Sequence, residues 1–315
     1  MSTIHADIFR LNRQPTLSPW FATKLEEMIG FGIYHNSVPA LADALTEKLV
    51  NYSQEYGKST VVLGMSGGID SAVTAALFKR AGYRVIGVTL PIHQNPEETA
   101  RGIEACKALD IEHEHIDLTP VYNSMVDFYQ SIDVDFNKEL VDDNMRQQNI
   151  RKGNIRARLR MITLYNLASK HGGFVASTDN FSELAAGFWT LHGDVGDVAP
   201  IQSLTKSWEV PALAEHLSVP QSIVEAVPTD GLGIANGDED QFGFSYLEFD
   251  IALFSLMRGG VELDRLDDTD KRIVDAVASR VSGTTYKRIN PLNLDHPLYS
   301  DRFDNLSNLD IYLRR

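Results

Sequence analysis

The chain has 315 residues, 43% of them hydrophobic, and 29 Lys and Arg against 43 Asp and Glu give it a net charge of −14. This length and composition predict a globular protein with a sizeable core, and the acidic balance makes nucleic acid a poor partner because a polyanion would be repelled. The single cysteine, Cys106, excludes an intramolecular disulfide framework and a multi-cysteine metal cluster. We expect a cytoplasmic protein without a membrane partner, since no signal-peptide-like start and no membrane-spanning apolar run is visible.

The first predicted element is a helix over residues 38–57, where leucines recur at helical spacing and Gly57 is a typical C-terminal cap. Apolar runs then alternate with helical patterns. The strands are expected at 60–65, 83–91, 111–118 and 172–178, with helices at 71–81, 97–109, 120–130 and 153–170. This alternation predicts the α/β class with a doubly wound parallel sheet, in a single domain with helical additions whose core spans about residues 38–290. Ligands of such sheets bind at the carboxyl ends of the strands.

The segment 61–82, VVLGMSGGIDSAVTAALFKRAG, places a glycine turn between a strand and a helix. Backbone N–H groups and the helix N-terminus there form an anion site, and Gly67 and Gly68 let the backbone approach an oxyanion closely. Ser66 and Ser71 can add hydroxyl donors, and Asp70 can hold magnesium. A Walker loop would carry a lysine. Its absence favours a reaction in which the outer two phosphates leave as pyrophosphate and cations arrive from elsewhere in the chain. The plain alternative is a glycine turn capped by serine.

The motif SGGIDS resembles the signature of N-type ATP pyrophosphatases. Further blocks follow in the order found in ammonia-dependent NAD synthetases: GNIRARLRM (153–161), STDNFSELAAGFWTLHGD (177–194), PIQSLTK (200–206), PTDGL (228–232) and DEDQFGFSY (238–246). The resemblance covers about residues 40–290. It implies an adenine nucleotide hydrolase-like, Rossmann-type fold and a ligase that adenylates deamido-NAD with ATP and Mg²⁺. Ammonia then displaces AMP to give NAD. It also implies a homodimer.

Site residues follow from the resemblance position by position. The implied ATP contacts are Gly64, Met65, Ser66, Gly67, Gly68, Ile69, Asp70, Ser71, Thr178, Lys206 and Thr229. The implied metal ligands are Asp70 and Glu183, the deamido-NAD contacts are Arg158, Asp197 and Lys287, and the catalytic residues are Asp194 and Lys206. Thr229 follows Pro228 at the start of the segment 228–243, whose four glycines and four acids predict a mobile loop that closes over the reaction. The roles of Asp238 and Glu239 in that loop are unassigned.

Several of these residues have simpler interpretations. Asn180 and Glu183 also have the spacing of a capping box, which does not exclude metal binding. Arg158 and Lys206 could be solvated side chains. Asp194 could merely make a turn. In favour of a catalytic Asp194, ammonia is mostly ammonium at neutral pH, so its use requires an anionic group that attracts the cation and takes its proton.

Two positions depart from the family pattern, because Leu191 and Tyr286 stand where the shorter bacterial enzymes carry Lys and His. His113 and His115 share one strand face without a third ligand, which argues against a metal site. We expect free ammonia as the nitrogen donor unless a partner chain supplies it, since 315 residues leave no room for an amidase domain. The alternatives are another N-type ATP pyrophosphatase that amidates or thiolates a different substrate, and a non-catalytic adenine-nucleotide sensor.

Overall fold

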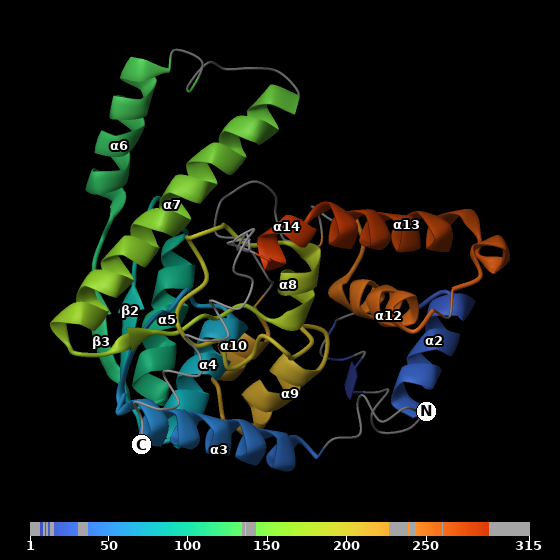
Figure 1. Ribbon diagram of the computed structural model, residues 1–315, viewed down its shortest axis with the longest axis horizontal. Helices are drawn as coiled ribbons and strands as arrows, with labels where there is room; N and C mark the ends of the chain where they lie inside the picture. The colour runs from blue at the N-terminus through green and yellow to red at the C-terminus, as the bar shows by residue number, and fades with distance from the viewer. Residues whose placement is uncertain are drawn as a thin grey trace, which may run out of the picture.

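The computed structural model describes residues 7, 8, 10, 12, 16–30, 37–133, 136, 143–226, 239, 243–259 and 261–289. Figure 1 shows a small sheet covered by helices, with a further group of helices beside it. The strands are β1 (Thr60–Gly64), β2 (Arg84–Thr89), β3 (Glu112–His115) and β4 (Phe174–Val175). The elements around them are α2 (Pro19–Gly30), α3 (Val38–Tyr56), α4 (Ile69–Arg80), α5 (Pro96–Ala108), α6 (Thr119–Ile132), α7 (Asp143–Lys170), α8 (Phe181–Ala186), α9 (Glu209–His216), α10 (Gln221–Val224), α12 (Tyr246–Met257), η1 (Leu263–Arg265), α13 (Asp268–Gly283) and α14 (Thr285–Arg288).

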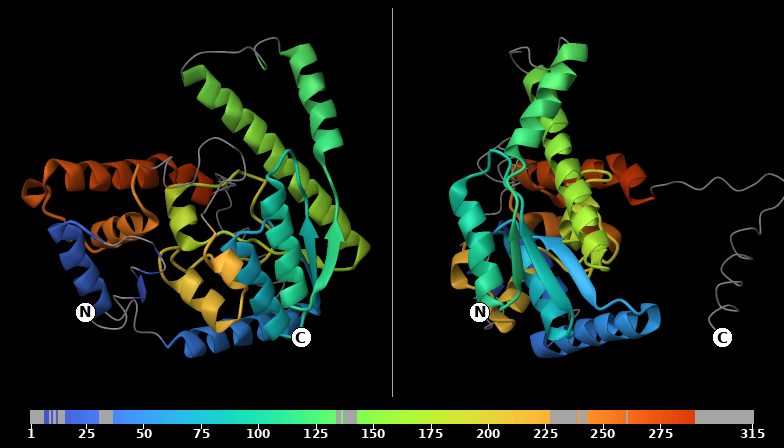
Figure 2. Two further views of the ribbon diagram at one scale, coloured as in Figure 1. Left: turned by 180° about the vertical axis from the view of Figure 1, so that it is seen from behind. Right: turned by 90° about the vertical axis from the view of Figure 1, so that its left-hand side faces the viewer.

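The four strands form a parallel sheet in the order β3-β2-β1-β4. β1 is a short apolar run because both of its faces are buried, one under α4 and the other under α7. β3 lies at the edge and is mostly exposed, which suits its sequence EHEH. Helices on both faces of the sheet, visible in the right-hand view of Figure 2, confirm the predicted doubly wound α/β class.

Most element boundaries differ from the predicted ones by one to three residues, as in β3, which ends at His115 and not at residue 118. α7 begins at Asp143, ten residues before the expected start, because its first turns are polar and carry little apolar periodicity. β4 comprises only two residues, and Ala176 continues the pairing with an isolated bridge to Val198. The chain therefore leaves the sheet just before Thr178, which places that residue at the carboxyl end of β4. The cap predicted at Gly57 is confirmed by its left-handed φ of 64°.

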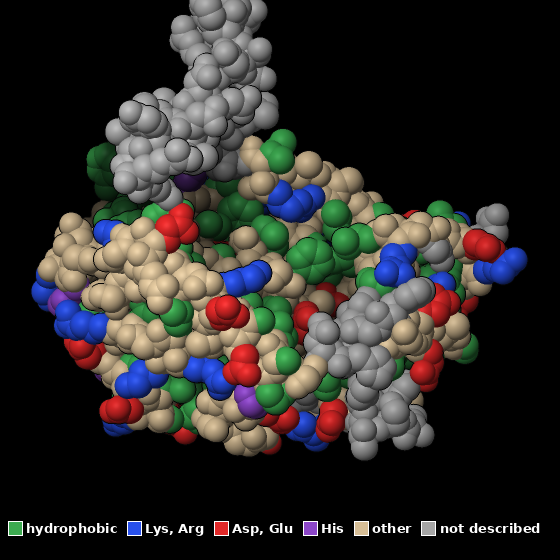
Figure 3. Space-filling view, turned by 60° about the horizontal axis from the view of Figure 1, so that its bottom comes forward, with side chains coloured by type: hydrophobic (Ala, Val, Ile, Leu, Met, Phe, Trp, Pro, Cys, Tyr) green, Lys and Arg blue, Asp and Glu red, His purple; other side chains and the backbone are tan. Residues whose placement is uncertain are grey.

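A second core lies beside the sheet, between α2, α8, α12 and α13. Phe21 of α2 and Phe249 of α12 are fully buried in it. The N-terminal segment also reaches the main body, since the Asn12 side chain donates to the carbonyl oxygen of Ser207 at 2.7 Å. Within the described helices, none combines the length and the apolar character that a membrane span requires. Figure 3 shows acidic and basic side chains interspersed over the described surface of one face.

Candidate active site

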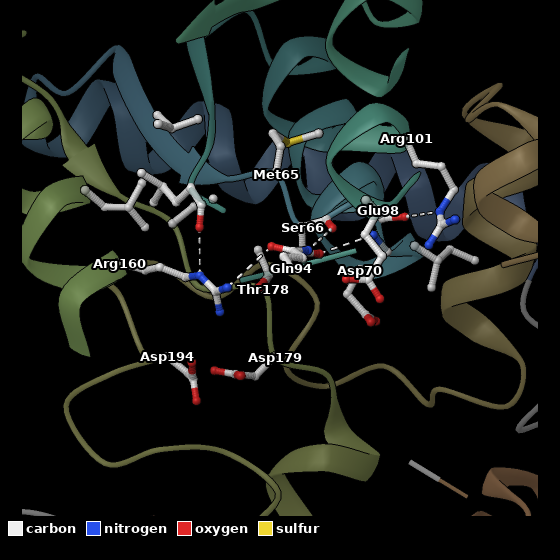
Figure 4. Close-up of a pocket in the computed structure, with 18 of the residues that line it drawn as sticks. Met65, Ser66, Asp70, Gln94, Glu98, Arg101, Arg160, Thr178, Asp179 and Asp194 are labelled. Atoms are coloured by element: carbon white, nitrogen blue, oxygen red, sulfur yellow. Dashed lines mark hydrogen bonds between the residues drawn. The ribbon is translucent and has the colours of Figure 1, made fainter. Parts of the chain in front are cut away.

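A cavity of about 270 Å³ opens where β1 and β4 end, as the fold predicts. It is lined by the loop after β1, one side of α7, the segment after β4 and one lysine from a distant loop (Figure 4). Predicted site residues that line it are Gly64, Met65, Ser66, Gly67, Gly68, Ile69, Asp70, Thr178, Glu183, Asp194 and Lys206. Segments more than 130 residues apart in the sequence, such as those of Asp70 and Lys206, therefore meet in one site.

The loop after β1 has the geometry of an anion cradle. α4 starts at Gly68 without a side-chain cap, so the N–H groups of its first turn are left for a ligand. Gly67 has a φ of 86°, and a Cβ there would lie 2.1 Å from the carbonyl oxygen of Glu98 on α5. Ser71, one of the predicted ATP contacts, is buried and donates to the carbonyl of Gly68 at 3.0 Å. It supports the loop from within and is not among the cavity-lining residues.

Asp70 and Glu183 face the same cation, the ammonium group of Lys206. Nζ donates to Oδ2 of Asp70 and, at 3.3 Å, to Oε1 of Glu183. Asn180 hydrogen-bonds to the second oxygen of each carboxylate. Its amide donates to Oδ1 of Asp70 at 3.0 Å, and its side chain and backbone form a capping box with Glu183. The capping box is thus confirmed, and it orients Glu183 toward Lys206 rather than excluding it from the site.

The residues also fit a magnesium ion. Mg²⁺ prefers hard oxygen ligands and commonly takes one or two carboxylates together with substrate phosphates. The Asp70 and Glu183 carboxylates already share a cation, which shows that both point at one position. No group of three or more His, Cys, Asp or Glu suited to a metal occurs in the described part of the chain. Two carboxylates beside a phosphate cradle match an ion that completes its shell with nucleotide oxygens and water.

Asp250 of α12 is a buried acid that the sequence did not indicate. It accepts hydrogen bonds from Oγ of Ser182 at 2.5 Å and from the backbone N–H of Ser207 at 3.1 Å. Ser182 in turn accepts from the backbone N–H of Lys206 at 2.9 Å. The carboxyl group therefore ties the helix of Glu183 to the loop of Lys206 and positions both. Burial raises its pKa to about 6, against an ordinary value of 3.8.

This raised pKa predicts a pH dependence of stability. Between about pH 4 and 6 the folded protein binds a proton at Asp250 that the unfolded chain releases, so the free energy of unfolding falls as the pH rises. A shift of about two units corresponds to about 3 kcal/mol. In urea denaturation, the free energy of unfolding of wild type should fall by about 3 kcal/mol between about pH 4 and pH 7. The free energy of unfolding of Asp250→Asn should not show this fall. Parallel pH profiles of the two proteins would contradict this assignment.

Asp179, Asp194 and Arg160 form a second charged cluster in the same cavity. Figure 4 shows the two carboxylates pointing toward one another below the guanidinium. Arg160 donates to the carbonyl of Leu90 at 3.1 Å and to the amide oxygen of Gln94 at 3.4 Å. Burial raises the pKa of Asp179 well above its usual range, and the neighbouring charges of Asp194 and Glu183 raise it further.

The environment separates the two acids of this cluster. Burial also raises the pKa of Asp194, but the backbone N–H of Thr190, which donates at 2.5 Å, and the charge of Arg160 oppose this rise. At Asp179 the rise in pKa is opposed by the hydrogen bond that the Ser177 hydroxyl donates at 3.3 Å. Asp194 is therefore the acid of this pair that ionises more readily. The turn interpretation of Asp194 also holds, because one oxygen caps a turn while the residue lines the cavity.

Three predicted substrate contacts lie outside the residues that line this cavity: Arg158, Asp197 and Lys287. Arg158 is exposed and donates to the carbonyl of Leu191 at 3.2 Å. Asp197 accepts from the Tyr165 hydroxyl at 2.8 Å and from the backbone of Val175 at 2.9 Å.

Lys287 donates to the carbonyls of Gly187 at 2.6 Å and Trp189 at 2.5 Å, and burial lowers its pKa. Tyr286, which stands where the shorter bacterial enzymes carry His, is exposed. Thr229, Asp238 and most of the loop 228–243 lie outside the described residues. Glu239 accepts from the backbone N–H of Tyr246 at 2.7 Å.

The remaining sequence candidates have structural roles. His113 and His115 share one strand face as predicted, and both contact Oγ1 of Thr89, at 3.0 and 2.8 Å. Cys106 is buried against the sheet, and burial raises its pKa to about 12, which suppresses the reactive thiolate at neutral pH.

Comparisons with known proteins show which proteins the chain resembles. The family model described as NAD synthase matches residues 41–291. The NH(3)-dependent NAD(+) synthetase of Pelodictyon phaeoclathratiforme is 33% identical over 264 residues, which cover 82% of this chain and 90% of that protein. Among solved structures, the NMN synthetase of Francisella tularensis is 28% identical with a TM-score of 0.69, covering 83% of this chain and 99% of that one.

The NH3-dependent NAD synthetase of Campylobacter jejuni is 25% identical with a TM-score of 0.64, and the similarity covers 82% of this chain and all of that one. The matched residues include the cradle after β1, both acid clusters and Lys206. The fold, the site and the extent of these similarities lead to one conclusion: the chain belongs to the NAD synthase family.

Proposed function

We propose that this chain amidates deamido-NAD with ammonia, using ATP and releasing NAD, AMP and pyrophosphate. One observation carries the proposal: a phosphate cradle, an acid pair suited to magnesium and a second acid pair beside an arginine line the same cavity. The relatives named NH(3)-dependent NAD(+) synthetase support the choice of reaction.

In the first step the nicotinate carboxylate attacks the α-phosphorus of ATP and pyrophosphate leaves. Adenylation is required because a carboxylate repels nucleophiles and oxide is a very poor leaving group. The N–H groups after Gly67 hold the phosphates, and Lys206 stabilises the charge that develops on phosphorus and on the departing pyrophosphate. Asp70 and Glu183 would hold Mg²⁺, whose chemistry is to neutralise phosphate charge.

In the second step ammonia attacks the acyl carbon and AMP leaves. Asp194 attracts the ammonium ion and takes its proton, which leaves a free lone pair on nitrogen. Asp179 keeps its own proton and so lowers the negative charge that would otherwise repel the substrate carboxylate. Arg160 lies beside both acids, where a cation can orient a carboxylate or phosphate oxygen. Arg158, Asp197, Lys287 and Thr229 stay predicted nucleotide contacts.

We also propose that two copies of the chain associate, as the resemblance implies. Large apolar side chains are exposed on the outer helices α6 and α7: Val121, Phe128, Ile132, Ile150, Ile162 and Tyr165. These two helices form an arm that extends beyond the sheet in Figure 1. Exposed apolar side chains of this size favour burial against a partner. Light scattering after gel filtration should give twice the chain mass of 35.1 kDa.

A second candidate substrate is the mononucleotide, nicotinic acid mononucleotide. The similarity to the Francisella tularensis NMN synthetase favours it, since that similarity covers nearly all of the other chain. Leu191 stands at a position where the resemblance implies a contact to deamido-NAD through a lysine, and Tyr286 stands where the resemblance expects His. The same two steps apply to either nucleotide, because both carry the same pyridine carboxylate.

The test is to incubate the protein with ATP, Mg²⁺ and ammonium, and to offer deamido-NAD or nicotinic acid mononucleotide in parallel. NAD and AMP should form in equal amounts with deamido-NAD. With the mononucleotide, nicotinamide mononucleotide and AMP should form more slowly or not at all. A faster reaction with the mononucleotide would make the mononucleotide the substrate and leave the proposed chemistry unchanged. Formation of ADP, or no turnover with either nucleotide, would contradict the proposal. Replacing ammonium with glutamine tests the nitrogen donor and should abolish product.

A further inference from the structure

The Lys206 ammonium group fills the position between the two acids that the proposed function assigns to magnesium. Its contacts with Asp70 and Glu183 lie within a largely buried cluster, where the side chain of Lys206 is 8% exposed and those of the acids are 16% and 14%. The ring of Tyr246 lies on another side, with its centroid 5.7 Å from Nζ. In this state the Lys206 ammonium group neutralises part of the negative charge of the acid pair.

Both acids are held in place independently of the lysine. Asn180 donates its side-chain amide to Oδ1 of Asp70 and its backbone N–H to Oε2 of Glu183, at 3.0 and 3.4 Å. The remaining oxygen of each carboxylate points at Nζ of Lys206. Because Asn180 fixes their separation, the two acids would still face one position after the ammonium group left.

The main chain around Lys206 is equally well held. Its own N–H donates to Ser182, and the N–H and carbonyl of Ser207 bond to Asp250 and Asn12. The flexible four-carbon stem of Lys206 is therefore the part of this cluster that can change partners without moving the loop.

The net charge of the cluster determines when Lys206 changes partners. The two acids and Lys206 sum to −1, and adding a divalent cation without removing the ammonium would make the buried cluster +1. A bound triphosphate lies against the neighbouring cradle and supplies negative charge to which the ammonium can move. We propose that Lys206 is an internal counter-ion that occupies the metal position in the nucleotide-free enzyme and passes to the phosphates when ATP and metal enter. This inference rests on the proposed function for the identity of the metal ligands.

The consequence is that metal and nucleotide bind with positive coupling. Without nucleotide, the wild-type chain binds a divalent ion weakly because the ion must first displace Lys206. Removal of the ammonium group leaves the two aligned acids without this competitor for the metal ion.

The experiment measures Mn²⁺ binding to the full chain without ATP or any other nucleotide, by electron paramagnetic resonance of the free ion. Lys206→Met and Lys206→Gln should bind Mn²⁺ at least about tenfold more tightly than wild type. The matched control is Lys24→Met, which removes a partly buried lysine of α2 that pairs with Glu27 outside the proposed site. Its Mn²⁺ affinity should equal that of wild type.

A thermal melt gives a second readout. Removing Lys206 leaves two acids without their cation, so both variants should melt below wild type in metal-free buffer, and Mn²⁺ should raise their Tm but not that of wild type. If a variant is unfolded without metal, Mn²⁺ should restore its folded circular dichroism spectrum. Variants that gain neither affinity nor Tm with Mn²⁺, or a wild type that binds the ion as tightly as they do, would overturn the proposal. Since no turnover is involved, this outcome is independent of whether NAD forms.

Discussion

Asp70→Asn should lower kcat/KM for NAD formation at least about 100-fold, which is the scale of losing one strong charge-stabilising group in an active site. Asp70 contributes one of the two carboxylates that face Lys206, and it begins the helix that carries the phosphate cradle. The amide of asparagine has nearly the same shape and can still accept from Asn180, so the loop geometry is retained. It lacks the charge that attracts Mg²⁺ and holds the ammonium group.

The matched control is Asp43→Asn, which removes an acid of the same type from an exposed ion pair with Arg80. Exposed pairs contribute about 0–1 kcal/mol, so this variant should keep wild-type activity and nearly wild-type stability. NAD and AMP formation measures activity, and circular dichroism confirms that both variants fold. Unchanged turnover in a folded Asp70→Asn variant would remove Asp70 from the proposed site.

Gly67→Ala should lower ATP-dependent turnover by about 100-fold by pushing the cradle away from α5. The new Cβ would lie 2.1 Å from the carbonyl oxygen of Glu98, a backbone atom that cannot rotate away. Gly102 on α5 faces the same contact, since a Cβ there would lie 2.6 Å from the carbonyl oxygen of Met65. Relief of the clash requires the loop and the helix to separate by an ångström or more. Displacements of about that size cost roughly 100-fold in rate when they misplace reacting groups.

Gly82→Ala is the control that distinguishes the effect of this clash from the effect of backbone strain. Gly82 has a φ of 82°, close to the 86° of Gly67, but a Cβ at Gly82 would meet no atom within 4 Å. Both substitutions therefore place alanine at a similar left-handed φ, which costs about 1–2 kcal/mol in backbone strain. Only Gly67→Ala should lose turnover, and it should also lose more free energy of unfolding in urea than Gly82→Ala does. Equal turnover in the two variants would show that the close approach of α5 is not required.

Local sequence signals were sufficient for the cradle and for the core of the fold. Strand, glycine turn and small-residue helix are neighbours in the chain, so the Gly67 turn and the start of α4 follow from residue types alone. The capping box of Asn180 and Glu183 is equally local, because its hydrogen bonds join residues three positions apart. The resemblance, not the spacing, assigned Lys206 and Asp70 to one ATP site, and only the fold shows that the two side chains, 136 positions apart, are in contact.

Arg160 shows why other site residues were missed. It lies in the same RARLR run as Arg158, and the sequence offers no way to choose between them. Two residues along a helix turn by about 200°, so the pair points in nearly opposite directions. In the fold Arg158 is exposed and Arg160 lines the cavity.

The chain's own pattern of residues was enough to establish the α/β class, the anion cradle and the family, because each depends on contacts between near neighbours or on ordered blocks. The placement of Asp179 against Asp194, of Asp250 behind Ser182, and of Lys206 between two acids depends on how β4, α8 and α12 pack together. Burial in that packing sets the charge and the partners of these groups, and burial is a property of the folded chain that no single residue type carries.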